Sequence, residues 1–178
     1  MINYLSLTKT NSSAHPDFIR CLELYHQAFP PDERRPTDAL TALLAQQAFS
    51  FYTISLNKNL AGFITCWNFS QFAFIEHFAI FPEMRSAGTG SLALQKILHK
   101  QTLPVILEVE LPDSTEAVKR IRFYEKNGFH ILSKQYIQPA YSREKKPVEA
   151  WLMGNQQPGT LQLNNFVKHL HTEVYPFI

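Results

Sequence analysis

Stretches in which apolar, β-branched and aromatic residues dominate or alternate with polar ones predict the strands of this chain. We expect strands at about 2–7, 49–56, 61–69, 72–80, 105–110, 129–137 and 148–153. Asn57-Lys58-Asn59 separates two of these stretches and is typical of a hairpin turn. The segment at 138–147 is polar and bounded by prolines, so we expect it to form a loop.

Apolar residues three or four positions apart predict the helices. Phe18, Leu22, Tyr25 and Phe29 mark a helix over about 17–28, which Pro30-Pro31 ends. Further helices are expected at 39–48 with Thr37 or Asp38 as the cap, at 88–100, from an Asp113 or Ser114 cap to Asn127, and at 160–175. Gly128 fits the position just past a helix end.

The order of these elements predicts the fold class. It reads strand, two helices, three strands, helix, strand, helix, two strands, with a helical tail. Meandering strands followed by alternation indicate an α/β fold with a mixed, mainly antiparallel central sheet of about seven strands and helices on both faces. No repeat or linker divides the chain, so we expect one domain over 1–178.

Composition and charge narrow the class of protein. A length of 178 residues, 45% hydrophobic and 18% charged, suits a globular domain with a continuous core. We expect no membrane span and no signal peptide, and the two cysteines have no metal-type spacing. The chain is therefore expected in the cytoplasm without a metal. A net charge of +2 with scattered basic residues does not indicate nucleic-acid binding.

The segment IEHFAIFPEMRSAGTGSLALQKI predicts an anion site. A strand pattern runs into Pro82, a loop with Arg85, Gly88 and Gly90 follows, and a helix starts directly afterwards. Backbone N–H groups at a helix N-terminus have no intrahelical partner and bind anions. Glycine lets a phosphate approach the main chain, and arginine suits phosphate. The chain is therefore expected to hold a phosphorylated cofactor.

Two common phosphate motifs do not fit this loop. A Walker loop requires a lysine, which Thr89-Gly90-Ser91 lacks, and a dinucleotide fingerprint requires a third glycine where Ala93 stands. The stretch Arg85-Ser86-Ala87-Gly88-Thr89-Gly90 instead resembles the acyl-CoA-binding loop of the GNAT acyltransferase superfamily, whose pattern is Arg/Gln-x-x-Gly-x-Gly/Ala.

Other stretches extend this resemblance in the same order. VILEVE at 105–110 is similar to the fifth strand of GNAT enzymes, and IRFYEKNGF at 121–129 to their Tyr-Glu-Lys-x-Gly-Phe segment. FPPDERRP and YIQPAYSREKKPVEAWLM resemble an uncharacterised bacterial subgroup. One position departs from the family: Ala117 stands where many members carry a cofactor-contacting Asn, and Lys119, Arg120 or Arg122 is the expected substitute.

The resemblance implies an N-acetyltransferase that moves an acetyl group from acetyl-CoA to a primary amine by direct attack in a ternary complex. The amine belongs to a small molecule or a peptide. The residues that the family pattern assigns to the cofactor are Phe78, Ala79, Ile80, Arg85, Ser86, Ala87, Gly88, Thr89, Gly90, Ser91 and Tyr124. The strand around Phe78 and Ile80 is expected to pair with pantetheine and to polarise the thioester carbonyl.

An ammonium group must lose a proton before it can attack, and two carboxylates are candidate bases. Glu76 lies on the presumed cofactor strand, and Glu108 lies mid-strand on the face opposite Leu107. Either can equally be a structural partner of a neighbouring strand. The resemblance makes Tyr124 the expected acid beside the departing sulfur. His77 is expected to point away from Glu76 and to pack in the core.

Several alternatives remain open at this stage. A non-catalytic acyl-CoA-binding module would keep the loop, and an interaction domain would use the fold without cofactor. Glu33-Arg34-Arg35 either lines the acceptor mouth or is a solvated face. The tail ending Tyr175-Pro176-Phe177-Ile178 packs on its own domain or on a partner, so a monomer and a homodimer are both compatible with the sequence.

Overall fold

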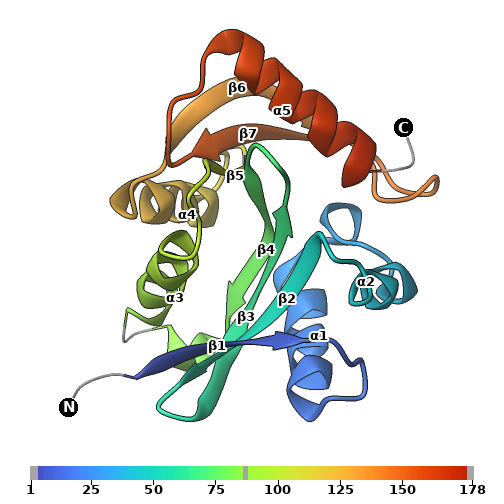
Figure 1. Cartoon of the computed structure of the whole chain (residues 1–178), viewed down its shortest axis with the longest axis vertical. Coiled ribbons are helices and arrows are strands. Elements are labelled where there is room, and N and C mark those ends of the chain that lie inside the picture. Colours follow the sequence, from blue (N-terminus) through green and yellow to red (C-terminus); the bar gives the residue numbers. More distant parts are fainter. Residues whose placement is uncertain (1–3, 86–87, 176–178) are drawn as a thin grey trace.

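The computed structural model describes residues 4–85 and 88–175, and a single sheet runs through them. Its strands lie in the order β1-β2-β3-β4-β5-β7-β6 (Figure 1). Their bounds are β1 Leu5–Thr10, β2 Phe49–Leu56, β3 Asn59–Asn68, β4 Ala73–Ile80, β5 Val105–Glu110, β6 His130–Gln138 and β7 Val148–Gly154. Neighbouring strands are antiparallel except for β4 and β5, which are parallel.

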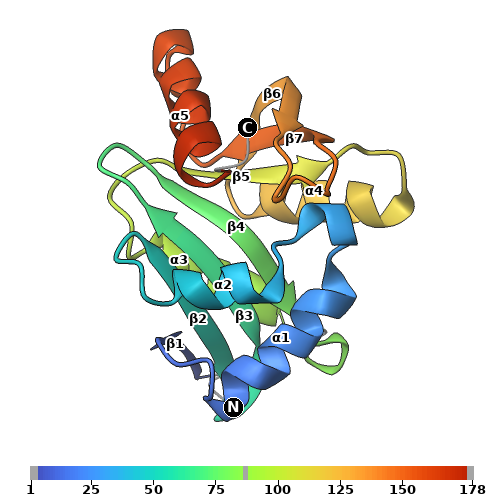
Figure 2. The ribbon, with the colours of Figure 1, turned by 90° about the vertical axis from the view of Figure 1, so that its right-hand side faces the viewer.

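Helices cover both faces of this sheet. One face carries α1 (Pro16–Ala28), α2 (Thr37–Leu43) and α5 (Thr160–Glu173), and the other carries α3 (Thr89–Leu98) and α4 (Thr115–Lys126) (Figures 1 and 2). Single 3₁₀ turns lie at Pro31–Glu33 and Pro82–Met84. The predicted fold class, an α/β fold with a seven-stranded, mainly antiparallel sheet and helices on both faces, is confirmed.

Local chemistry explains several of the boundaries that the sequence predicted. The Ser114 hydroxyl accepts a hydrogen bond from the Ala117 N–H and caps α4, and Gly128 takes a left-handed conformation (φ 89°) past its end. Asn57 and Lys58 have φ values of 51° and 69°, as a two-residue hairpin between β2 and β3 requires. These two predictions are correct.

The bounds of two predicted elements are wrong. The first strand runs to Thr10 rather than to Leu7, because its pairing with β2 continues as far as Phe51, and positions 2–3 of the prediction lie outside the described residues. The second helix begins at Thr37, with Pro36 rather than Thr37 or Asp38 at the cap, and ends at Leu43 rather than near residue 48. After Leu44 buries its side chain, the chain must turn back to the sheet, where the Ala48 carbonyl accepts from the Asn68 N–H. Tertiary pairing therefore overrides the helical propensity of the segment.

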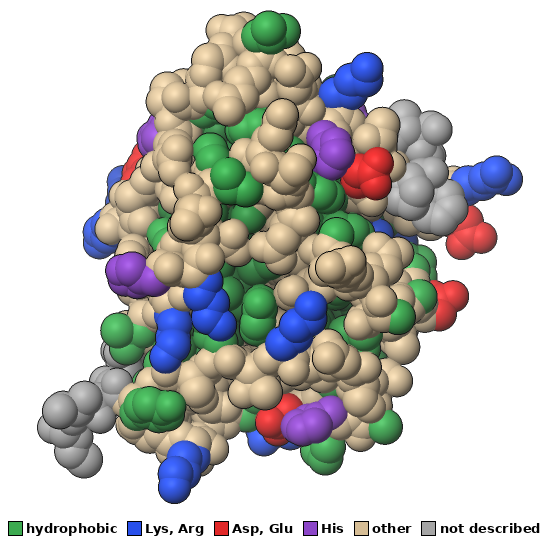
Figure 3. Space-filling model, viewed as in Figure 1, with side chains coloured by type: hydrophobic (Ala, Val, Ile, Leu, Met, Phe, Trp, Pro, Cys, Tyr) green, Lys and Arg blue, Asp and Glu red, His purple; other side chains and the backbone are tan. Residues whose placement is uncertain are grey.

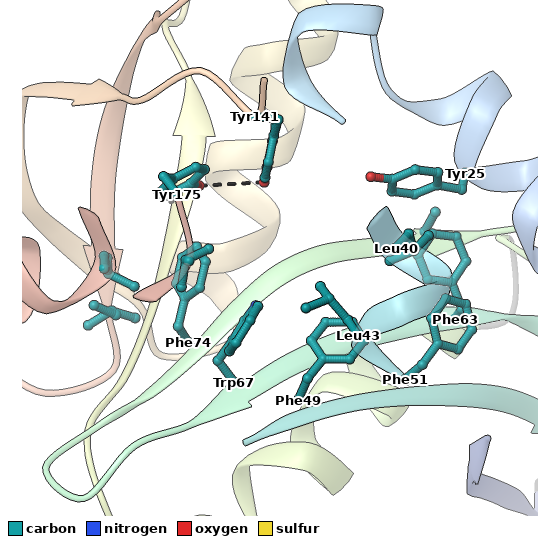
Figure 4. Close-up of a cluster of buried hydrophobic side chains, with 14 of the residues drawn as sticks. Tyr25, Leu40, Leu43, Phe49, Phe51, Phe63, Trp67, Phe74, Tyr141 and Tyr175 are labelled. Atoms are coloured by element: carbon teal, nitrogen blue, oxygen red, sulfur yellow. Dashed lines mark hydrogen bonds between the residues drawn. The ribbon is translucent and has the colours of Figure 1, made fainter. Parts of the chain in front are cut away.

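Two apolar clusters fill the two sides of the sheet. The cluster under α1, α2 and α5 is strongly aromatic, and Figure 4 shows its rings stacked across β2, β3 and β4. Phe51 and Phe63 lie parallel with centroids 5.2 Å apart, and Phe18 tilts onto Phe51 at 4.9 Å. The cluster under α3 and α4 is mainly aliphatic. The abundant aromatic residues of the chain are therefore chiefly core residues.

Gly62 allows β3 and β4 to approach each other closely. A Cβ at this position would lie 2.2 Å from the Ala79 carbonyl oxygen, which is backbone and cannot move aside. We expect Gly62→Ala to lower the free energy of unfolding by about 1–3 kcal/mol, the range of overpacking substitutions. Gly159→Ala, where nothing lies within 4 Å, is the control and should cost less than about 1 kcal/mol by chemical denaturation. Equal losses would contradict this explanation.

Within residues 4–85 and 88–175, none of the helices is both long and apolar enough to cross a membrane. On the face seen in Figure 3, Lys and Arg side chains lie scattered among neutral ones, in keeping with the net charge of +2.

Candidate functional site

The strands β4 and β5 separate along their length and open a gap in the sheet. They pair only from Ala73 to Ile75 on β4 and from Val105 to Leu107 on β5. Beyond these pairs, β4 continues to Ile80 and β5 continues to Glu110. A cavity of about 480 Å³ lies in this gap, between the start of α3, the middle of α4 and the turn after α1.

The cavity gathers most of the residues that the sequence analysis assigned to the site. Its lining includes Glu76, Phe78, Ala79, Ile80, Arg85, Gly88, Gly90, Ser91, Glu108 and Tyr124. Thr89 is not part of the lining, because its side chain is buried at the start of α3. Ser86 and Ala87 lie outside the described residues. Segments far apart in the sequence therefore meet at one cavity, as the predicted site requires.

One end of the cavity has the chemistry of an anion site. Gly88 has φ 69°, and its carbonyl accepts the first helical bond of α3 from Leu92. By helix geometry, the N–H groups of the turn between these residues have no intrahelical acceptor. Arg85 lies beside them, with its Nε donating to the Ile80 carbonyl at 3.0 Å. Positive charge and free N–H donors thus converge where a diphosphate would sit.

Helix α4 adds further basic groups to this end. Lys119 and Arg120 both line the cavity, whereas Arg122 does not. Ala117, at the position where many family members carry an Asn, is fully buried. Gly90 packs against the ring of Phe123, and a Cβ there would lie 3.3 Å from the ring. The close contact between α3 and α4 therefore depends on glycine at this position.

A β-bulge in β4 changes the direction of two side chains. Thr65 pairs with His77 and Cys66 pairs with Ile75, which leaves Glu76 as the extra residue. A bulge breaks the alternation of a strand and re-aims its side chains. Glu76 and His77 therefore lie on the same face, with Nδ1 of the histidine 4.0 Å from the carboxylate. The expectation that His77 points away from Glu76 is wrong for this reason.

Glu76 is buried and fully partnered. Its side chain is 0% exposed and accepts from Arg35 Nε at 2.8 Å and from Trp67 Nε1 at 2.7 Å. Burial alone would raise the pKa of Glu76, but the positive charge of Arg35, together with His77 and the hydrogen bonds from Trp67 and Tyr141, holds that pKa below its usual value. Glu76 is thus a stable carboxylate with low proton affinity.

Glu108 has a different environment. Its Oε1 accepts from the Tyr136 hydroxyl at 2.5 Å and its Oε2 from the Tyr175 hydroxyl at 2.7 Å. Both donors are neutral. Burial raises the pKa of Glu108 to about 7, although the two hydrogen bonds oppose that shift. Glu108 therefore exchanges its proton near neutral pH, as a general base must.

His77 is held by the core around it. Its Nε2 lies 2.9 Å from the Glu33 carbonyl, which can only accept, so Nε2 carries the proton. The rings of Tyr25 and Phe29 meet it edge-on at 4.8 and 4.7 Å. Burial lowers the pKa of His77, although Glu76 opposes that shift, so the ring is neutral at physiological pH. These contacts are those of a packed core histidine, although His77 also lies in the wall of the cavity.

Tyr124 lies on α4 with its ring in the aliphatic cluster, and it lines the same cavity. Burial raises the pKa of Tyr124 to about 12. Among the described residues, none hydrogen-bonds its hydroxyl. A phenol with so high a pKa keeps its proton at neutral pH and can donate a hydrogen bond from the cavity wall.

The turn after α1 and the loop before β7 close the far end of the cavity. Lys145 Nζ donates to the carbonyls of Pro31 and Arg34, so the loop is tied to the turn. Glu33 lines the cavity, whereas Arg35 is buried at 5% exposed. Neither alternative for Glu33-Arg34-Arg35 therefore describes all three residues. Glu33 borders the cavity, as expected for the acceptor mouth, but Arg35 is buried rather than solvated.

Sequence analysis did not identify the partners of the two carboxylates. Arg35 and Trp67 hold Glu76, and Tyr136 and Tyr175 hold Glu108. Arg35 carried a weak signal, since it lies in a charged run that was already considered as part of the site. The tyrosines carried none, because aromatic residues at strand or helix spacing are usually core. Tyr175 does pack on its own domain, while residues 176–178 lie outside the described part.

Comparison with known proteins adds independent findings. The model of the "Acetyltransferase (GNAT) family" matches residues 18–129. Over 109 residues the chain is 28% identical to the "Putative acetyltransferase YjbC" of Bacillus subtilis (strain 168). That match covers 60% of this chain and 55% of the relative, so it spans about half of the relative's length.

Solved structures resemble the whole fold. A "Putative acetyltransferase from GNAT family" of Bacteroides thetaiotaomicron has a TM-score of 0.89 and 30% identity, covering 97% of this chain and 99% of that one. A GNAT family acetyltransferase of Elizabethkingia anophelis, solved with acetyl-CoA bound, has a TM-score of 0.59 and 14% identity, covering 84% and 96%. The second similarity concerns the fold alone.

Proposed function

This chain belongs to the acetyltransferase (GNAT) family, as its glycine loop and tyrosine helix predicted, and we propose that it transfers an acetyl group from acetyl-CoA to a primary amine by direct attack. The observation that carries this proposal is the cavity between β4 and β5. It joins an anion site at one end to Glu108 at the other. The acceptor is a small-molecule or peptide amine that enters from the Glu108 side.

The residues around the gap fit coenzyme A. The N–H groups of the first turn of α3 and Arg85 would hold the diphosphate. Lys119 and Arg120 line the same cavity, each paired with a carboxylate, Glu116 and Glu110 respectively. The edge of β4 from Phe78 to Ile80 would hold the amide-rich arm. When bound, acetyl-CoA supplies the activated acetyl thioester. A main-chain N–H of β4 would stabilise the negative charge that develops on the carbonyl oxygen.

Glu108 is the better candidate for the base that accepts the proton of the amine. A general base works best when its pKa lies near the working pH, and the pKa of Glu108 is about 7. The carboxylate also keeps one lone pair on each oxygen after accepting from the two tyrosines. Glu76 has a lowered pKa and is neutralised by Arg35, so we assign it a positioning role.

Tyr124 would stabilise the departing sulfur by a hydrogen bond. Because burial raises the pKa of Tyr124 to about 12, complete transfer of its proton to a thiolate of pKa about 8.5 is strongly uphill. Donation of a hydrogen bond needs no such transfer. Its place on the cavity wall, beside the gap in which the thioester would lie, supports this assignment.

The decisive experiment is a thiol-release assay with acetyl-CoA and a panel of amines that includes polyamines, amino sugars and peptides with free N-termini. We expect acetyl-CoA-dependent release with at least one amine. Coenzyme A that binds but supports no turnover with any amine would favour a non-catalytic binding module instead.

Coenzyme A is expected to stabilise the folded protein through the loop before α3. At 100 times its dissociation constant, a ligand adds about 2.7 kcal/mol, which corresponds to a rise in Tm of about 5–10 °C at this size. Arg85→Ala should weaken binding by about tenfold or more, because it removes a charged donor. Arg122→Ala, a basic residue of α4 outside the cavity, is the control for calorimetric titration. Equal affinities in both variants would contradict the assigned diphosphate site.

A further inference from the structure

The last described residues of the chain reach both candidate carboxylates, Glu108 directly and Glu76 through Arg35. The Val174 carbonyl accepts from Arg35 Nη2 at 2.6 Å, and Arg35 Nε in turn donates to Glu76. The next residue, Tyr175, donates its hydroxyl to Glu108 at 2.7 Å. Two consecutive residues therefore tie together groups that lie far apart in the sequence.

Packing of α5 fixes the position of these two residues. Phe166, Leu170 and Val174 follow one another at four-residue spacing, and all are fully buried on the aromatic side of the sheet. The ring of Phe166 lies 4.5 Å from that of Phe72. This apolar stripe anchors the helix against the sheet beside β6 and β7 (Figure 1) and so fixes the position of its end.

Tyr175 itself is enclosed. It is 0% exposed, its ring lies 4.9 Å from that of Tyr141, and the two hydroxyls are 3.5 Å apart. Figure 4 shows the two rings side by side, above Phe74 on β4. An enclosed ring in a fixed position holds its hydroxyl in one direction, toward Glu108.

We propose that Tyr175, at the end of α5, is a positioning residue of the acetyl-transfer site that orients the Glu108 carboxylate and favours its ionised form. This inference rests on the proposed function, in which Glu108 is the base. It makes the C-terminal helix part of the active site, although the helix lies outside the segment that the family model matches, residues 18–129.

The geometry supports orientation. The hydroxyls of Tyr136 and Tyr175 bind different oxygens of Glu108, which fixes the plane of the carboxylate. Each oxygen keeps a lone pair for an incoming N–H. A carboxylate held by a single donor could rotate about its Cγ–Cδ bond. The rate of proton transfer falls steeply when the base is misaligned with the amine.

The charges around Glu108 support the role of Tyr175 in the ionisation of this carboxylate. Glu76 on β4 disfavours its ionised form, while Arg35, from the turn after α1, favours it. Tyr136 on β6, Tyr175 after α5 and Tyr141 in the loop before β7 are neutral, because burial and the nearby carboxylates raise the pKa of each of them. The imidazole of His171 on α5 packs against Tyr136, with ring centroids 5.6 Å apart. It is neutral because burial lowers the pKa of His171. The two hydroxyl donors are thus the main local groups that stabilise the anion.

Tyr175→Phe removes one donor and retains the ring. Because a hydrogen bond to the ionised form lowers a pKa, its loss should move the acid limb of the kcat/KM profile to higher pH by about one unit. At pH 6 this is a loss of nearly tenfold, since a shift of one unit changes the ionised fraction by at most tenfold, and the affinity for acetyl-CoA should not change. Tyr52→Phe, on β2 at the other side of the sheet, is the matched control and should leave the profile unchanged.

A readout that needs no turnover separates this inference from the proposed function. Carbon-13 titration of the Glu108 carboxyl, assigned with Glu108→Gln, should show a higher pKa in Tyr175→Phe than in the wild type. If no amine is acetylated but this pKa shifts, the proposed function fails and the contact stands. If transfer depends on Glu108 but Tyr175→Phe alters neither the acid limb nor the titration, the inference is overturned.

A second variant guards against a folding defect in Tyr175→Phe. Incorporation of 3-fluorotyrosine at position 175 keeps the ring and makes the hydroxyl a stronger donor, so the acid limb should move to lower pH. If the acid limb of this protein lies at the same pH as that of the wild type, Tyr175 does not control the ionisation of Glu108.

Discussion

Glu108→Gln should lower kcat/KM for acetyl transfer by about 10²–10⁴-fold, the usual contribution of general acid–base catalysis. Glutamine has nearly the same shape and can still accept a hydrogen bond from a tyrosine, but it cannot take a proton from an ammonium group. Glu110→Gln is the matched control, because Glu110 lies on the same strand and face and pairs with Arg120. It should retain most of the activity.

The pH dependence provides the sharper test of Glu108. The wild-type kcat/KM should rise with pH through about 7, as Glu108 loses its proton, and the glutamine variant should lack this acid limb. Both profiles are measured by thiol release between pH 5.5 and 9. A limb near 7 that persists in the variant would assign the titration to another group and exclude Glu108 as the base.

Stability should change in the opposite direction. The folded-state pKa of Glu108, about 7, lies above the value of 4.5 for an unperturbed glutamate. Between these values the folded state holds a proton that the unfolded state has lost, so this group reduces stability as the pH rises. At pH 8, therefore, Glu108→Gln should melt no lower than the wild type. Lost activity with an intact melting temperature separates a chemical defect from a folding defect.

The pattern of hydrophobic and polar residues predicted most of the fold, because the residues of each element determine which of its faces is buried. The strand at 49–56 was identified to the residue, and Ser114, one of the two predicted caps, and Gly128 marked the ends of α4. Where the conformation of a segment depends on pairing with a distant strand, the sequence pattern was misleading. The residues after Leu43 read as helix, yet the chain must turn there to begin the pairing of β2 with β3.

Sequence patterns predicted most of the residues that line the candidate cavity, but not the hydrogen-bond partners of its carboxylates. The glycine loop and the tyrosine helix have local signatures, so the cavity lining was largely foreseen. The β-bulge at Glu76 has no such signature, because one unpaired residue alters direction without altering composition. Arg35 and Tyr175 reach their carboxylates across 41 and 67 positions, and only the folded chain brings them together.

The two carboxylates illustrate how environment divides the roles of identical side chains. Glu76 receives a permanent charge from Arg35, and its pKa is lowered despite burial. Glu108 receives only neutral hydroxyls, and its pKa rises to about 7. A carboxylate that is always ionised organises its surroundings, while one that titrates near neutrality can exchange protons. This difference is the reason to assign the base to Glu108 and a positioning role to Glu76.

Arg35→Met should therefore destabilise the fold strongly at neutral pH. It leaves the Glu76 carboxylate buried beside Trp67 without its cation, and breaking a buried pair from one side costs about 3–5 kcal/mol. At this chain length the loss corresponds to a fall in Tm of roughly 6–20 °C. Arg122→Met, at an exposed position of α4, is the control and should melt near the wild type.

The pH dependence of that loss identifies its cause. In the wild type the pKa of Glu76 is lower in the folded state than in the unfolded state. The ion pair therefore contributes its full stabilisation at a pH above the pKa of the unfolded state, and this stabilisation is lost as the pH falls through the pKa of the folded state. Without Arg35, burial should raise the pKa of Glu76 above its usual value, and protonation then relieves the cost. The gap in Tm between variant and wild type should therefore narrow from pH 8 to pH 5. A gap that stays constant would mean that Arg35 stabilises by packing against Trp67 and Tyr141, and not by neutralising Glu76.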